Sequence, residues 1–312
     1  MNDREKFAQE KLEELIDANN NEKGEGGQYA ASELLGISNS ILSQLRRGVY
    51  KGNTGKMWEK IATYFEAKQE AAETYKSSGY VPIRTSEEII AYMRYCHIKG
   101  GVMAITGDAG IGKTMAIRRY IDLYPEGVVL LTMRNGYRSI KTGLMVFAKA
   151  LGIKEKFKNI YTLCEEISER LKDNMLIVID EAQHCSLRMI DNFRSFTDEF
   201  DGTKKTLGMV FIGNKTTADK FGGSQDSELG QISSRAIINT SYGVDDVTLE
   251  DVAKLFPDIA NDGASVEFMH GITQGPQGIR GAVRVYEVAK DNKNTSYDGL
   301  VAAAKHKGLA IR

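Results

Sequence analysis

Short, nearly continuous apolar runs recur through the middle of the chain and predict buried strands. They cover residues 103–107, 128–132, 175–179, 207–213 and 236–238. A strand that is covered on both faces loses the alternation of polar and apolar positions, because neither face meets water. Helical patterns stand between several of these runs, at residues 85–97 and 115–124, with apolar positions three or four residues apart. This alternation predicts an α/β core.

The first eighty residues show helical spacing instead. Residues 4–18 have an apolar stripe typical of an amphipathic helix, and residues 56–75 predict a long helix. Between them a short helix is expected to end near Leu35. Gly36 permits a tight turn after it, and Ser38 can cap the next helix. This is the spacing of a helix-turn-helix.

The second helix of this pair would present side chains that suit the groove edges and phosphates of DNA. They are Asn39, Ser40, Ser43, Gln44 and Arg47. Across residues 46–60, five basic side chains and one acidic side chain add a patch that can face phosphates. The alternative is a packing module of three helices with a solvated basic face. We expect DNA binding, because the turn and the charge occur together.

Polar and small residues mark the boundary after these helices, and helical spacing returns near the end of the chain. Four helices are expected there, at 247–256, 264–272, 278–289 and 296–309. We therefore expect an N-terminal all-α helix-turn-helix domain (1–76), a linker (77–84), a nucleotide-binding core (85–243) and a helical C-terminal domain (244–312).

The segment after the first apolar run has the composition of a phosphate-binding loop. Gly107 is followed, at the required spacing, by Gly112, Lys113 and Thr114, with a strand before the motif and a helix after it. Glycines let backbone N–H groups turn towards phosphates, and the helix N-terminus adds its positive end. Lys113 can reach the β- and γ-phosphates, and the Thr114 hydroxyl can bind Mg²⁺. The expected nucleotide contacts are Gly107, Asp108, Ala109, Gly110, Ile111, Gly112, Lys113, Thr114 and Met115.

Two carboxylates follow the apolar run that begins at Met175. Asp180 is expected to hold Mg²⁺ through water, and Glu181 to polarise the attacking water as general base. Neighbouring residues on a strand point in opposite directions, which suits two separate roles. Asn214 ends the next run and would orient the same water. Arg235 stands just before the last run, where it could reach the γ-phosphate of a neighbouring subunit, or form a surface salt bridge instead.

A second basic region lies after the second apolar run. Residues 134–158 contain seven basic side chains and one acidic side chain. Arg134, Arg138 and Lys141 begin it, at the carboxyl end of a strand, where α/β sheets place their ligands. The segment either contacts the DNA backbone or is a solvated helix face, and its charge allows both.

Composition limits the remaining possibilities. There are 41 basic and 42 acidic residues, for a net charge of −1, so any DNA binding must depend on local patches. The three cysteines have no metal-ligand spacing, which predicts a reducing compartment without disulfides. No apolar run approaches the roughly 20 residues of a membrane span, and the start of the chain is charged, unlike a signal peptide. We expect a cytoplasmic protein with no membrane partner.

Taken together, the phosphate loop, the acidic pair, Asn214 and Arg235 resemble the motifs of AAA+ ATPases. The resemblance implies a five-stranded parallel sheet, subunit contacts made through ATP and Mg²⁺, and a small helical lid formed by the C-terminal domain. In that pattern a Gly-Ala-x-Arg sequence on the third lid helix senses the nucleotide. Arg284 fits the pattern, and Arg280 is an alternative one turn earlier on the same face.

The order of helix-turn-helix module, short linker, AAA+ core and lid resembles the family of phage Mu transposition protein B, over nearly the whole chain. This resemblance implies a protein that binds double-stranded DNA with ATP and without strong sequence preference. It also implies a homo-oligomeric helical filament on the DNA, delivery of that target to a transposase, and stimulation of strand transfer in the bacterial host cytoplasm. Two alternatives are an AAA+ helicase loader or replication initiator, and an ATP-responsive helix-turn-helix transcription regulator.

Overall fold

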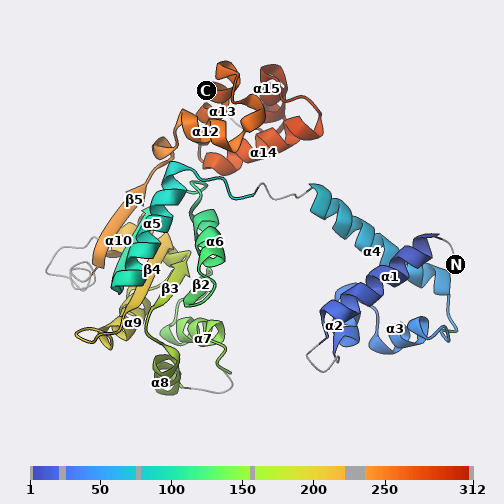
Figure 1. Ribbon diagram of the computed structural model, residues 1–312, viewed down its shortest axis with the longest axis horizontal. Coiled ribbons are helices and arrows are strands. Elements are labelled where there is room, and N and C mark those ends of the chain that lie inside the picture. Colours follow the sequence, from blue (N-terminus) through green and yellow to red (C-terminus); the bar gives the residue numbers. More distant parts are fainter. Residues whose placement is uncertain (1–2, 21–25, 75–78, 155–158, 222–235, 309–312) are drawn as a thin grey trace. The chain divides into compact units, whose positions relative to one another are not determined.

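The structure is a computed structural model that describes residues 3–20, 26–74, 79–154, 159–221 and 236–308 (Figure 1). The chain divides into two compact units, Met1–Gly79 and Tyr80–Arg312. Each unit has a hydrophobic core of its own.

The first unit consists of four helices around one small core. They are α1 (Asp3–Ala18), α2 (Gly27–Leu35), α3 (Asn39–Arg46) and α4 (Thr54–Thr74). The turn between α2 and α3 has the expected form. Gly36 has a φ of 57°, Ile37 is buried, and the Ser38 hydroxyl accepts a hydrogen bond from the N–H of Ile41 at the start of α3. Leu12, Leu42 and Trp58 are among the side chains that fill the core.

The second unit is built on a five-stranded parallel sheet, as the AAA+ resemblance implied. The strands are β1 (Gly101–Gly107), β2 (Val128–Thr132), β3 (Met175–Asp180), β4 (Leu207–Gly213) and β5 (Ala236–Tyr242). Their order is β2-β3-β4-β1-β5, and each neighbouring pair is parallel. The carboxyl ends of all five strands therefore lie at one edge of the sheet, where ligands of α/β proteins bind.

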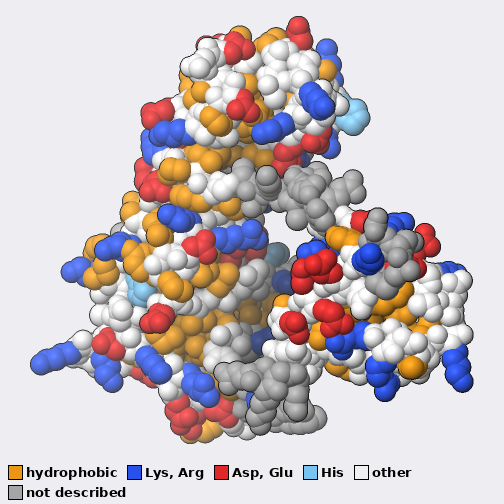
Figure 2. Space-filling view, turned by 45° about the vertical axis from the view of Figure 1, so that its right-hand side comes forward, with side chains coloured by type: hydrophobic (Ala, Val, Ile, Leu, Met, Phe, Trp, Pro, Cys, Tyr) orange, Lys and Arg blue, Asp and Glu red, His pale blue; other side chains and the backbone are white. Residues whose placement is uncertain are grey.

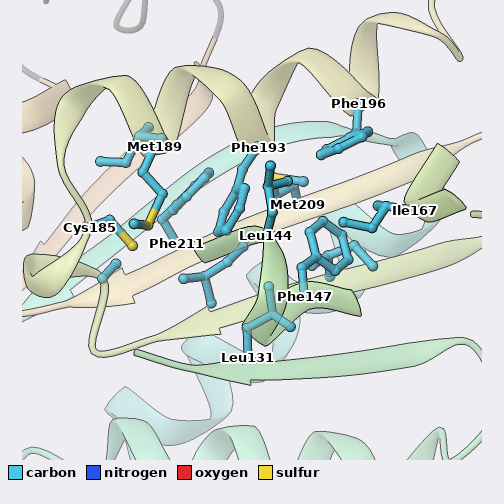
Figure 3. Close-up of a cluster of buried hydrophobic side chains, with 14 of the residues drawn as sticks. Leu131, Leu144, Phe147, Ile167, Cys185, Met189, Phe193, Phe196, Met209 and Phe211 are labelled. Carbon is cyan, nitrogen blue, oxygen red and sulfur yellow. The ribbon is translucent and has the colours of Figure 1, made fainter. Parts of the chain in front are cut away.

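Helices cover both faces of this sheet, which explains why the strands are apolar at successive positions. They are α5 (Arg84–Lys99), α6 (Lys113–Leu123), α7 (Ile140–Ala150), α8 (Ile160–Arg170), α9 (Leu187–Asp198) and α10 (Lys215–Phe221). Ile177 and Ile179 of β3 belong to the core that includes Phe193 of α9, which Figure 3 shows. The alternate residues Leu176 and Val178 belong to the core on the other face, with α5 and α6.

The lid is entirely helical within the described residues 244–308. Its helices are α12 (Leu249–Leu255), α13 (Gly263–Thr273), α14 (Gly278–Asp291) and α15 (Tyr297–His306), and short 3₁₀ turns cover Val244–Asp246 and Pro257–Ile259. Val252, Met269 and Val285 are among the side chains of its separate core, and Ile83 from the start of the second unit joins them. Among the described helices of both units, none combines the length and the apolar character that crossing a membrane demands.

Candidate nucleotide-binding site

The phosphate loop joins β1 to α6 in the middle of the sheet. β1 ends at Gly107 and α6 begins at Lys113, so the loop lies at the carboxyl end of a strand that has neighbours on both sides. Gly110 and Gly112 have φ values of 78° and 98°, a region that residues with a Cβ rarely adopt. These two residues let the chain turn sharply into α6, whose N-terminal N–H groups face the loop.

Lys113 folds back over the loop that it follows. Its Nζ donates hydrogen bonds to the carbonyl oxygens of Gly107 at 2.9 Å and Asp108 at 2.7 Å. Burial lowers the pKa of Lys113, and the carboxylates of Glu181 and Asp180 act in the opposite direction. The ammonium group therefore lies inside the loop, within electrostatic reach of both acidic residues at the end of β3.

Asp180 and Thr114, expected to share a metal ion, lie together. Asp180 is only 6% exposed, and burial raises its pKa. The hydrogen bond from the N–H of Glu181 opposes that rise, and so, to a smaller extent, do the charge of Lys113 and the Thr114 side chain. Carboxylate and hydroxyl oxygens are the ligands that Mg²⁺ prefers. The two residues come from the end of β3 and the first turn of α6, so the fold itself brings this oxygen set together.

Glu181 stands just beyond the strand, exposed, with a φ of 57°. Its N–H donates to Oδ1 of Asp180 at 2.9 Å, which stabilises this unusual conformation for a residue with a side chain. The turn carries the Glu181 carboxylate away from the buried Asp180 carboxylate. The two acids thus occupy different environments, one buried and one solvated.

Asn214 directly follows β4, and Lys215 begins α10. The Asn214 side-chain oxygen accepts hydrogen bonds from the backbone N–H of Thr216 at 3.0 Å and from its hydroxyl at 2.6 Å. The oxygen therefore caps α10, which leaves the amide NH₂ as the group that can meet a water or phosphate.

Gln183, which we did not expect to have a role, connects these groups. Its Nε2 donates to Oε2 of Glu181, and its Oε1 accepts from the N–H of Asn214 at 3.2 Å. The sequence offered no spacing signal for this bridge, because Asn214 is 31 positions away.

Asp108 in the phosphate loop is tied to the ends of two other strands. Its carboxylate pairs with Nζ of Lys215 at 2.9 Å and accepts from the N–H of Val244 at 3.2 Å. The hydrogen bond from Lys215 is the main cause of the lowered pKa of Asp108. The loop is thereby connected to the start of α10, which follows β4, and to the residues that follow β5.

The N-terminal end of α14 rests directly on the phosphate loop. The carbonyl oxygen of Gly110 accepts from the N–H of Ile279 at 3.0 Å, and a Cβ on Gly110 would lie 2.1 Å from the carbonyl oxygen of Gln277. Arg280, on the same turn, lies close enough to Lys113 to lower the pKa of that lysine. Arg284 instead donates to Oε1 of Gln277 at 3.2 Å.

Residues 83–85, near the start of the second unit, also border the candidate nucleotide site, which the sequence did not indicate. The Thr85 hydroxyl donates to the carbonyl oxygen of Ile111 at 3.2 Å, and the N–H of Arg84 donates to Oδ1 of Asp251 in the lid at 2.9 Å. The Ile83 side chain lies 3.6 Å from the position of a Cβ on Gly112. This segment therefore contacts both the phosphate loop and the lid.

The expected DNA contacts of the second unit lie at the same edge of the sheet. Arg134, Arg138 and Lys141 are exposed in the connection from the carboxyl end of β2 into α7. Gly136, with a φ of 103°, forms the turn between the two arginines. Part of the basic segment, residues 155–158, lies outside the described residues, and so does Arg235.

In the first unit, Asn39, Ser40 and Arg47 are exposed, while Ser43 and Gln44 are half-buried. Asn39 accepts a hydrogen bond from Gln28 at 2.6 Å, and Nε of Arg47 donates to the Ser43 carbonyl at 3.2 Å.

Two basic residues counted in the phosphate-facing patch have structural contacts instead. Arg46 pairs with Glu13 and donates to Gln28 at 2.8 Å, and Nζ of Lys60 donates to the Gly36 carbonyl at 2.9 Å. The patch is therefore smaller than its sequence suggested, because these two cations hold the helices together.

Comparison with known proteins agrees with this geometry. A family model described as an AAA domain matches residues 97–221. The chain is 26% identical over 263 residues to the Mu-like prophage FluMu DNA transposition protein B of Haemophilus influenzae, covering 83% of this chain and 89% of that protein. It is 23% identical over 251 residues to the ATP-dependent target DNA activator B of Escherichia phage Mu, covering 78% of this chain and 77% of that protein.

Solved structures share the fold at low sequence identity. The ORC2 protein of Aeropyrum pernix in its ADP form matches with a TM-score of 0.56 and 14% identity, over 75% of this chain and 72% of that one. Cdc6p of Pyrobaculum aerophilum matches with a TM-score of 0.53 and 18% identity, over 75% of this chain and 70% of that one. The chain therefore contains an AAA domain, which supports ATPase activity, and its resemblance to the transposition proteins B of Mu-like phages, expected from the motifs, is confirmed over most of its length.

Proposed function

We propose that this ATPase is an ATP-dependent target DNA activator in DNA transposition, acting in the cytoplasm of a bacterial host. With ATP bound it coats double-stranded DNA as a helical filament without strong sequence preference. It then delivers that DNA to a transposase and stimulates strand transfer. The observation that supports this most is that Lys113, Thr114 and Asp180 lie together at one edge of the sheet, in a chain whose similarity to two target-activating or transposition proteins covers most of its length.

The residues of the site fit ATP and Mg²⁺. Backbone N–H groups of the loop and the Lys113 ammonium would hold the phosphates, and Thr114 and Asp180 would hold Mg²⁺, which would supply positive charge beside the phosphoryl group. Glu181 accepts the proton of the attacking water. The Asn214 NH₂ orients that water, since its side-chain oxygen is already bonded to α10.

Arg280, rather than Arg284, is the arginine of the lid that contacts the nucleotide. Its charge contributes to the lowered pKa of Lys113, and it is on the turn of α14 that touches the phosphate loop. A second arginine, Arg235, would reach the γ-phosphate of the neighbouring protomer and make filament assembly depend on ATP. That assignment depends on its position in the sequence alone.

DNA contacts come from Arg134, Arg138 and Lys141 in the second unit, and from the exposed face of α3 in the first. Figure 2 shows Lys and Arg side chains interspersed with Asp and Glu over the visible face. Because the net charge of the whole chain is −1, DNA binding depends on small local sets of basic residues. Stacking of protomers would align the sets into a track along the DNA backbone. Backbone contacts of this type are insensitive to base sequence and weaken with salt.

A direct test compares two variants with wild type by electron microscopy and by ATPase assay, on duplex DNA with and without ATP. Lys113→Ala is expected to abolish ATP-dependent DNA binding, because phosphate binding is lost. Glu181→Gln is expected to bind ATP, hydrolyse it at least about 100-fold more slowly, and form longer-lived filaments.

Lys204→Ala is the matched control, since this exposed lysine precedes β4 at the opposite edge of the sheet. If Lys113→Ala bound DNA as well as wild type in the presence of ATP, this would contradict the proposed dependence of DNA binding on ATP binding. Normal turnover by Glu181→Gln would remove that residue from its role. Protection of one specific sequence, in place of uniform coating, would favour a transcription regulator.

A further inference from the structure

The Gln183 side chain links two residues that the proposed mechanism uses separately. Gln183 lies in a 3₁₀ turn, Ala182–His184, that begins directly after Glu181. One end of its amide bonds the Glu181 carboxylate, and the other end bonds the backbone of Asn214. The water-activating acid and the water-orienting amide are thus connected through a single side chain.

The chemistry of the two partners fixes the orientation of this amide. The backbone N–H of Asn214 can only donate, so it must face the Gln183 oxygen. The carboxylate oxygens of Glu181 accept hydrogen bonds, and the bond that one of them makes is donated by the Gln183 NH₂. Reversing the amide would place two donors together at one end and two acceptors at the other.

The surroundings hold Gln183 in place from two directions. Nζ of Lys220 in α10 donates to the main-chain carbonyls of Gln183 at 2.7 Å and of Cys185 at 2.6 Å. The first carbonyl lies within the turn, and the second directly follows it. A Cβ on Gly213 would lie 2.8 Å from Oε1 of Gln183, so the absence of a side chain there leaves room for the amide against β4. The bridge is therefore supported by a fixed backbone.

The Glu181 end of the bridge faces the nucleotide site. Among the acidic groups that act on Lys113, Glu181 has the largest effect on the pKa of that lysine, ahead of Asp180 and Asp108. Its carboxylate is exposed and follows a turn with positive φ, so it would sample several rotamers without a partner. The hydrogen bond from Gln183 restricts that freedom.

We propose that Gln183 is a positioning residue for ATP hydrolysis. Its amide holds the Glu181 carboxylate at a set separation from Asn214, so that one water molecule can meet both groups. This inference rests on the proposed role of Glu181. In this role Gln183 acts on hydrolysis only through the Glu181 carboxylate that it holds. Its loss therefore affects the rate of hydrolysis and leaves the affinity for nucleotide unchanged.

The test measures kcat for ATP hydrolysis and the Kd of a fluorescent ATP analogue, in the full chain with Mg²⁺. Gln183→Ala removes the whole bridge. Gln183→Glu keeps the size and the acceptor for Asn214 but replaces the donor with a second negative charge. Both are expected to lower kcat by about 10- to 100-fold, with Kd within about twofold of wild type, because a displaced general base slows chemistry without weakening binding.

His184→Ala is the matched control, because it alters the same turn and keeps the bridge; its kcat is expected to stay near wild type. The analogue also reports folding, since an unfolded variant does not bind it, and the isosteric Gln183→Glu covers the case in which Gln183→Ala is unstable. A kcat near wild type in Gln183→Glu would overturn the proposal. So would a loss confined to Kd, or an equal loss of kcat in His184→Ala.

Glu181→Gln in the same experiment separates this inference from the proposed function. If Glu181→Gln is inactive and the Gln183 variants hydrolyse normally, Glu181 is the base and Gln183 does not position it. If Glu181→Gln hydrolyses ATP normally, Glu181 is not the general base. The proposed positioning role of Gln183, which depends on Glu181, is then rejected as well.

Discussion

At the scale of single residues, burial decides the chemistry of the three cysteines. Burial raises the pKa of Cys96 and of Cys185 to about 12 and raises that of the half-buried Cys164 by a smaller amount. Only the thiolate reacts with alkylating agents. At pH 8 we expect iodoacetamide to modify Cys164 first, and Cys96 and Cys185 only after denaturation.

Mass spectrometry of peptides after short exposure to the reagent checks this order. Denaturation in urea before labelling is the control, and all three thiols should then react at similar rates. Early modification of Cys96, which lies under β1 and β4, would mean that this part of the sheet opens readily.

The two arginines of α14 form a natural pair for comparison. Both are exposed, and they are separated by one helical turn on the same face. The charge of Arg280 acts on Lys113, whereas Arg284 bonds Gln277. Arg280→Ala is therefore expected to lower kcat/KM for ATP by about 10-fold or more, and Arg284→Ala by less than about twofold. Steady-state ATPase assays check this, and the reverse order would return the role to Arg284.

Residues of the site could be predicted from the sequence where their chemistry depends on local spacing. Lys113 and Thr114 follow a strand and begin a helix, and Asp180 ends a strand, so neighbouring residues define each position. Gln183 and Ile83 could not be found in this way. Their contacts are made with residues far away in the chain, and a lone Gln or Ile has no spacing that marks a role.

At the scale of elements, Gly110 connects the phosphate loop to the lid. Its φ of 78° strains any other residue, and a Cβ would lie 2.1 Å from the Gln277 carbonyl, a backbone atom that cannot move by itself. Gly110→Ala is expected to destabilise the second unit by more than about 1–2 kcal/mol, which is the cost of the left-handed conformation alone. It should also weaken ATP binding, because the start of α14 is pushed off the loop.

Gly152→Ala is the matched control for this substitution. Gly152 has a φ of 72°, and nothing lies within 4 Å of a Cβ there, so only the conformational cost applies. Urea denaturation and nucleotide titration together check both variants. Equal destabilisation of the two, with unchanged ATP affinity, would show that the close approach to Gln277 is unimportant.

The helices between β2 and β4 show why some elements were missed. In α9, Met189, Ile190, Phe193 and Phe196 are buried, at a spacing that is typical of a helix. The apolar stripe was present in the sequence. Residues 134–158, which contain α7, were interpreted through their positive charge instead. Charge indicates that a segment is at the surface, but it does not define its secondary structure. The strands were predicted well because covering both faces leaves an unbroken apolar run.

At the scale of the whole molecule, the parallel sheet places two kinds of chemistry at one edge. The carboxyl ends of β1, β3 and β4 supply the nucleotide site, and the carboxyl end of β2 leads to the basic loop of Arg134 and Arg138. β2 pairs with β3, and the N–H of Met133, just after β2, donates to the carbonyl oxygen of Asp180 at 3.0 Å. A shift of the backbone at the end of β3 can therefore be passed directly to the loop that follows β2. The carboxylate proposed to hold Mg²⁺ and the loop proposed to contact DNA thus share a backbone connection.

This arrangement predicts how DNA affinity should respond to salt. If Arg138 and Lys141 each neutralise one phosphate, the double variant Arg138→Ala/Lys141→Ala should flatten the slope of log K against log salt by about 2, since each contact contributes roughly 0.9. Arg170→Ala/Lys172→Ala removes the same charge from the opposite edge, ahead of β3, and should leave the slope unchanged. Fluorescence anisotropy between about 50 and 200 mM salt measures the slope, and light scattering verifies that oligomers still form. A flattened slope specific to the first pair would assign the backbone contact to the β2–α7 loop, whereas equal slopes for both pairs would place the DNA track elsewhere on the protein.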